Sequence, residues 1–165
     1  MKKATLFLSV FLCIITCFKA NAQSYNKLEQ NVTTNILGAQ IPGIGIDYSI
    51  GANIDDTFYV GGGFGLGTWF DQKDEYYTDV WFPIFLQLRT TFLREQKFRP
   101  YISLSVGLDC LSIGAIINPN IGVAIKTTSS SLFYIGIGYN TYNIEHKLDK
   151  NTLESMFSAH LGVSF

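Results

Sequence analysis

The chain has 165 residues, 47% of them hydrophobic and 15% charged, and its formal net charge is −1. This length suits a single domain, and the near balance of charge gives no basis for binding nucleic acid, which requires a basic surface. After residue 22 the chain contains no apolar run long enough for a membrane-spanning helix. If the remaining chain crosses a membrane, it must therefore do so as a closed β-barrel, in which every backbone polar group is paired.

Residues 1–22 have the pattern of a secretory signal peptide. Lys2 and Lys3 precede an apolar run at 4–18, and an Ala-Asn-Ala cleavage motif ends at Ala22. The apolar run is too short to be a spanning helix. We therefore expect cleavage after Ala22, which leaves one domain of residues 23–165.

The predicted mature chain carries nine basic residues against thirteen acidic residues, a net charge of −4. Cys110 is its single cysteine, so no intrachain disulfide is expected. The alternative for the N-terminus is a lipoprotein signal that uses Cys17. Cleavage after Ala22 is favoured, because Thr16 stands where such signals have glycine, alanine or serine.

Most of the mature chain alternates between apolar and small or polar residues, as β-strands with two different faces do. Residues 23–31 are polar and predict a short lead-in. We expect eight strands, at 32–40, 44–54, 57–69, 80–93, 99–111, 116–126, 132–142 and a last strand that ends at 165. A tilted barrel strand needs about 9–11 residues to cross a bilayer, and these segments are long enough.

The connections between the predicted strands differ in length in a regular way. Those after the second, fourth and sixth strands are short, whereas those after the third and seventh, at 70–79 and 143–151, are longer. Outer-membrane barrels have short turns on the periplasmic side and longer loops on the outer side. In the third strand, glycines alternate along 61–67, and we expect them to leave room for large inward side chains of neighbouring strands.

Alternation alone does not distinguish a membrane barrel, with aliphatic side chains facing lipid, from a soluble lipocalin-like barrel that carries an apolar ligand. The non-aliphatic face carries Asp47, Arg89, Asp109, Lys126 and His160. Aromatic residues also cluster at the strand ends, as in the girdles of membrane barrels. We therefore predict that Ile135 and Ile137 point outward, and that the five polar residues form an interior charge network. Eight strands enclose a space that side chains fill, so no open pore is expected.

The terminal Phe165, the signal peptide and the segments PYISLSVGLD, NPNIGVAIK and LFYIGIGYN resemble the small, porin-like Gram-negative outer-membrane β-barrel family. The resemblance implies an all-β fold, a single eight-stranded antiparallel up-and-down transmembrane β-barrel over residues 32–165. It implies a place in the cell outer membrane, with membrane lipids including lipopolysaccharide and the barrel assembly machinery as partners. It also implies that Phe165, Val163 and Leu161 form the assembly signal. The family often has glycine five positions before the final aromatic residue, where this chain has His160.

Members of this family have diverse roles, so the resemblance specifies the fold of this protein better than its function. We expect a non-enzymatic structural or surface-contact protein with a side-chain-filled interior and with no cofactor, catalytic residue or metal site. The alternative is a lipid-modifying hydrolase that uses Glu154, Ser158 and His160, which share a face of the last strand. Same-face neighbours on a strand lie about 6.8 Å apart along it, which is long for a contact between Ser158 and His160, so interior packing is favoured.

Overall fold

The computed structural model describes residues 26–38, 42–55, 57–70, 80–111, 114–127, 131–146 and 150–165, without the side chains of 26, 27, 142–146 and 150–155. The predicted signal peptide lies outside these residues. Within the described part of the chain, no helix is long and apolar enough to cross a membrane.

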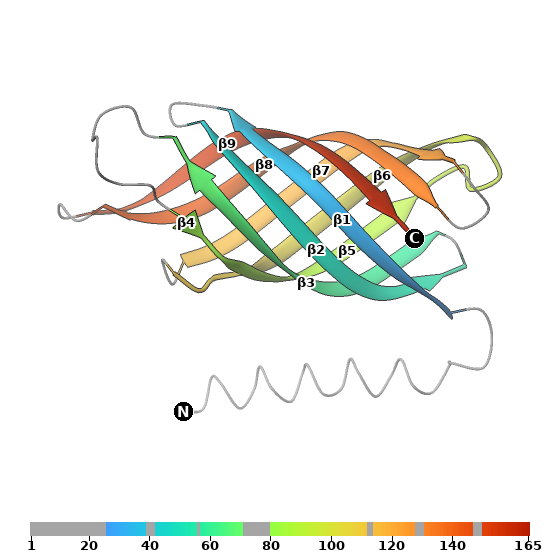
Figure 1. Ribbon diagram of the computed structural model, residues 1–165, viewed down its shortest axis with the longest axis horizontal. Coiled ribbons are helices and arrows are strands. Elements are labelled where there is room, and N and C mark those ends of the chain that lie inside the picture. Colours follow the sequence, from blue (N-terminus) through green and yellow to red (C-terminus); the bar gives the residue numbers. More distant parts are fainter. Residues whose placement is uncertain are drawn as a thin grey trace.

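The described residues form one antiparallel sheet that closes on itself (Figure 1). Its strands are β1 (Asn26–Gly38), β2 (Gly43–Ile54), β3 (Phe58–Trp69), β4 (Val80–Trp81), β5 (Pro83–Thr91), β6 (Phe98–Asp109), β7 (Gly114–Lys126), β8 (Leu132–His146) and β9 (Lys150–Ser164). β1, β2 and β3 pair in chain order, β3 pairs with both β4 and β5, and β5 to β9 again pair in chain order. The pairing of β1 with β9 closes the barrel.

The segments β4 and β5 are two parts of one barrel strand. Both pair with β3 in a single register, since Thr68 lies opposite Val80 and Phe64 lies opposite Ile84. The interruption falls at Phe82, next to Pro83, which has no N–H to donate to a neighbouring strand. The Phe82 amide instead donates to Asp109 Oδ1 at 2.9 Å. The molecule is thus an eight-stranded antiparallel barrel, and the predicted fold class is confirmed.

The outward rows of side chains are aliphatic and aromatic. Ile135 and Ile137 of β8 are 45% and 65% exposed on the outside of the barrel, whereas Tyr134 of the same strand points inward and is 4% exposed. The same arrangement recurs on β6, where Leu104 is outward and Ser105 is buried. An apolar outer surface around a polar interior is the arrangement of a transmembrane barrel. The soluble lipocalin-like alternative is therefore wrong, because it requires the aliphatic rows to line the interior.

Two predicted boundaries are also wrong. β1 begins at Asn26, so residues 26–31 are a strand and not part of a lead-in. Their polarity misled the prediction because buried Glu29 and Asn31 face a polar interior, where polar residues are expected.

The predicted loop at 143–151 is largely strand. β8 continues to His146 and β9 starts at Lys150, and the two pair with each other along this whole length. The pairing of β8 with β7 reaches Thr141, and that of β9 with β1 reaches Phe157. β8 and β9 thus reach past the other strands at one end of the barrel (Figure 1). A ribbon beyond the lipid needs no apolar face, so hydrophobic alternation does not reveal it.

Candidate functional site in the barrel interior

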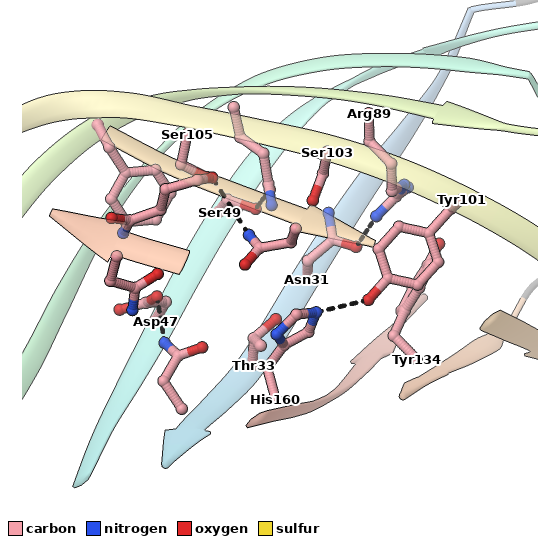
Figure 2. Close-up of a pocket in the computed structure, with 16 residues that line it drawn as sticks. Asn31, Thr33, Asp47, Ser49, Arg89, Tyr101, Ser103, Ser105, Tyr134 and His160 are labelled. Carbon is pink, nitrogen blue, oxygen red and sulfur yellow. Dashed lines mark hydrogen bonds between the residues drawn. The ribbon is translucent and has the colours of Figure 1, made fainter. Parts of the chain in front are cut away.

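The inward side chains of seven of the barrel strands surround a small polar chamber (Figure 2). Most of its lining residues carry amide or hydroxyl groups, contributed by alternate positions along each strand. The chamber has a volume of about 40 Å³. A buried water molecule needs about 10–15 Å³ by this kind of measure, whereas pockets for small organic ligands start near 300 Å³. The chamber is therefore of a size for a few water molecules and too small for an organic ligand.

One side of the chamber is occupied by a buried ion pair. Arg89 of β5 and Glu29 of β1 are joined through Nη2 and Oε1, and both side chains are buried. Arg89 Nη1 also donates to Asn31 Oδ1 at 2.9 Å. The guanidinium lies between two aromatic rings, 4.7 Å from the centre of Tyr59 and 4.4 Å from that of Tyr134. Such cation–π contacts strengthen where water is excluded, so Arg89 is held on several sides.

The Glu29 carboxylate connects several strands. Besides the ion pair, it accepts a hydrogen bond from Asn53 Nδ2 of β2 at 2.5 Å and one from the Tyr134 hydroxyl of β8 at 3.3 Å. The hydroxyl of Ser164, at the end of β9, donates to Tyr134 Oη at 3.5 Å. We call Glu29, Asn53, Arg89, Tyr134 and Ser164 the Glu29 cluster. A buried charge requires compensation of this kind, since an unpaired one is strongly destabilising.

The other polar groups pair locally. Asp47 of β2 accepts a hydrogen bond from Asn35 of β1 at 2.5 Å. The Tyr101 hydroxyl and His160 Nε2 lie 2.7 Å apart, and the Tyr101 ring packs edge-on against Tyr134 at 5.3 Å between centres. Figure 2 shows Tyr101, Tyr134 and Arg89 gathered on one side of the chamber, with Asp47 away from them.

An apolar cluster fills another part of the interior. It consists of the buried side chains Leu37, Trp69, Trp81, Ile116 and Met156. The rings of Trp69 and Trp81 lie 4.3 Å apart between centres. Sequence reasoning expected large side chains inside the barrel but did not predict that these five would gather in one cluster. The inward-pointing tryptophans at 69 and 81 were the available signal.

Glycines make room for these large side chains, as the alternation along 61–67 predicted. A Cβ atom placed on Gly67 would lie 2.0 Å from Trp81 Cζ2, and one on Gly63 would lie 2.8 Å from the Phe85 ring. Real Cβ atoms do not approach other atoms so closely, so each glycine accepts a ring of the neighbouring strand in the space that its own side chain would need.

In the part of the chain that the structure describes, the five predicted interior residues do not all lie together. Asp47, Arg89 and His160 have the separate partners described above. Asp109 Oδ1 accepts from the backbone amides of Phe82 and Leu111, at 2.9 and 3.2 Å. Lys126 is exposed at the end of β7, where side chains reach water. The main counter-charge of Arg89 is Glu29, which the sequence reasoning had placed in the lead-in.

Two of the three residues of the hydrolase alternative point into the barrel. Ser158 donates to Asn140 Oδ1 at 3.4 Å, and His160 contacts Tyr101. Both side chains are buried in the interior, and neither faces the lipid. The side chain of Glu154 lies outside the described residues.

Leu161, Val163 and Phe165, the residues of the predicted assembly signal, are exposed on the outward face of β9 and at its end. Phe165 also exchanges two backbone hydrogen bonds with Gln30 of β1, both of 3.0 Å, where the barrel closes. Their recognition by the assembly machinery stays a prediction.

No protein-family model matches the chain, and no curated protein sequence matches it. Its structure is similar to that of a de novo designed transmembrane β-barrel, with a TM-score of 0.55 and 8% identity over 87% of this chain and 97% of the other. It is also similar to Neisserial surface protein A (NspA), with a TM-score of 0.53 and 15% identity over 86% and 98%. The outer membrane enzyme PagL matches with a TM-score of 0.48 and 13% identity over 82% and 98%. The chain thus has the fold of the small eight-stranded outer-membrane β-barrels.

Proposed function

We propose that this protein is a small integral protein of the outer membrane with a non-enzymatic role, structural in its body and contact-forming at its outer surface. The observation that carries this proposal is that the barrel exposes apolar side chains on its outside and buries polar side chains inside. Outward residues such as Ile46 of β2, Leu66 of β3 and Ile121 of β7 are each more than half exposed, so the apolar surface extends to different sides of the barrel. A surface of this kind is stable in lipid, and in water it would form a large apolar patch prone to association.

The interior supports a role without transport or catalysis. The Glu29 cluster and the apolar cluster fill much of the barrel, and the chamber of about 40 Å³ is lined mainly by uncharged polar groups. The body of the barrel is then a rigid support for its loops and for the ribbon of β8 and β9. We further propose that the assembly machinery recognises Phe165 with Val163 and Leu161, and that the membrane lipids around the barrel include lipopolysaccharide.

Membrane fractionation combined with gel migration tests the location and the fold. We expect the full-length chain, expressed in a Gram-negative host, to stay with the outer membrane after an alkaline wash. Unboiled samples should migrate differently from boiled ones, because a closed barrel resists detergent at room temperature. A chain found in the soluble periplasmic fraction, with no dependence on boiling, would contradict the proposal.

Mass spectrometry of lipid A tests the non-enzymatic role. We expect the acyl chain profile of the host to be the same with the protein, with its Ser158→Ala variant and with an empty vector, because Ser158 and His160 face the interior. Loss of an acyl chain with the protein but not with Ser158→Ala would support the hydrolase alternative instead.

A further inference from the structure

The pairing of β1 with β9 is the joint that closes the barrel, and a turn does not set its register. Other neighbouring strands follow one another in the chain, and the length and type of the connecting turn fix how they align. β1 and β9 come from opposite ends of the chain and pair over Asn31–Gly38 and Phe157–Ser164. Another feature of the molecule must therefore select this alignment.

The alternation of apolar and polar residues in β1 does not select its alignment with β9. A shift of one residue would turn Glu29 toward the lipid, but a shift of two residues keeps every side chain on its own face. The outward face of β1 mixes Leu28 and Ile36 with Gln30 and Thr34, so its hydrophobic content changes little along the strand. The sequence pattern thus permits alignments two residues away from the observed one.

The Glu29 cluster connects the two sides of the joint through the interior. Glu29 lies on β1 and forms the ion pair with Arg89 of β5. Tyr134 of β8 and Ser164 of β9 lie on the other side of the β1–β9 joint from Glu29. Tyr134 donates to Glu29 at 3.3 Å, its ring lies 4.4 Å from the guanidinium, and Ser164 donates to it at 3.5 Å. A shift of two residues in the β1–β9 pairing would displace Tyr134 by about 6.8 Å along the strands relative to Glu29, beyond hydrogen-bonding reach.

We propose that the buried Glu29–Arg89 pair, with Tyr134, sets the register in which the first and last strands close the barrel. A buried ion pair is weak evidence for stability, because removing two charges from water offsets their attraction, but selecting a register is a documented use of buried polar groups. In a shifted barrel, Glu29 would lose the hydrogen bond that Tyr134 now donates to it across the joint. The charges thereby disfavour the alignments that the strand pattern permits.

Cysteine cross-linking measures this register directly. In a Cys110→Ser background, Thr34→Cys is combined with Leu161→Cys, its observed partner, or with Ala159→Cys or Val163→Cys, the partners after a shift of two residues. Residues opposite each other in a hydrogen-bonded pair have Cα atoms about 5.5 Å apart, which suits a disulfide, whereas diagonal neighbours are too distant. Each chain is refolded into detergent micelles and oxidised, and its disulfide yield is measured.

With Glu29 and Arg89 present, we expect the 34–161 pair to cross-link and the shifted pairs not to do so. With Glu29→Gln and Arg89→Met combined, shifted pairs should cross-link at a yield comparable with 34–161. The matched control is Arg99→Met. Arg99 is also a buried inward arginine, but it donates to the Gln96 carbonyl of its own turn at 3.1 Å, so 34–161 should remain exclusive.

Exclusive 34–161 cross-linking in the Glu29→Gln, Arg89→Met chain would overturn the proposal, as would equal loss of register in the Arg99→Met control. If the neutral chain does not fold, the exchanged chain, Glu29→Arg with Arg89→Glu, decides. Recovery of a folded barrel that cross-links only at 34–161 supports the proposal. Failure of the exchanged chain to exceed the folding yield of the neutral one overturns it.

Discussion

At the scale of single residues, the interior is fitted by pairs made of a glycine and a large side chain. Gly67 and Trp81 lie opposite each other on adjacent strands, and the indole occupies the space where a Cβ of residue 67 would stand. Gly62 on the same strand faces outward, and the nearest atom to its Cβ position is 3.8 Å away. Glycines of one strand therefore have different roles according to the face on which they lie.

This difference gives a paired prediction. Gly67→Ala should lower the free energy of unfolding by about 1–3 kcal/mol, because Trp81 must shift within a packed interior. Gly62→Ala, the matched control, should leave it nearly unchanged. Urea titration of the barrel in lipid vesicles, followed by tryptophan fluorescence, measures both. Equal effects of the two substitutions would show that Gly67 is not required for the packing of Trp81.

At the scale of elements, each strand exposes apolar side chains to lipid over part of its length. On β6, Phe98 begins the strand and Leu104 lies near its centre, and both side chains point outward. The hydrocarbon core of a bilayer is about 30 Å thick and is bounded by polar interfaces. The cost of a charge on the outward face therefore depends on its position along the strand.

We predict that Leu104→Arg destabilises the barrel by about 2–4 kcal/mol, and that Phe98→Arg, on the same face and strand, costs about 0–1 kcal/mol beyond the loss of its ring contacts. The reason is that arginine near the bilayer centre loses its hydration, whereas at a strand end it reaches the interface. Reversible unfolding in vesicles measures the two values. A larger cost at position 98 than at 104 would mean that the lipid does not surround β6 as proposed.

At the scale of the whole molecule, the barrel interior is filled by charged and polar side chains in one part and by apolar side chains in another. The Glu29 cluster holds charges in mutual contact, and the apolar cluster around Trp69 and Trp81 excludes water. Inside the barrel, the inward side chains leave a chamber of about 40 Å³. An eight-stranded barrel is just wide enough for its side chains to fill, so the described residues leave no room for an aqueous channel.

We therefore expect the purified barrel, reconstituted in planar bilayers, to show no stepwise ion conductance in 1 M salt, a concentration about sevenfold above the physiological one. A porin measured in the same bilayers provides the positive control. Discrete openings of constant amplitude that appear with the wild-type protein would contradict a filled interior, and with it the non-transport role proposed above.

The sequence by itself determined the fold class, the faces of the strands and most strand positions, because alternation with a period of two is a local property of consecutive residues. It correctly placed Ile135 and Ile137 outward and Arg89 and His160 inward. Only the tertiary structure decided that Arg89 pairs with Glu29, 60 residues away, and that Tyr101 contacts His160. Contacts across a barrel depend on strand order, tilt and the register of closure, which no short segment specifies. For the same reason the start of β1 was not predicted. Its polar residues Glu29 and Asn31 are recognisable as inward residues of a strand only from their contacts with Arg89.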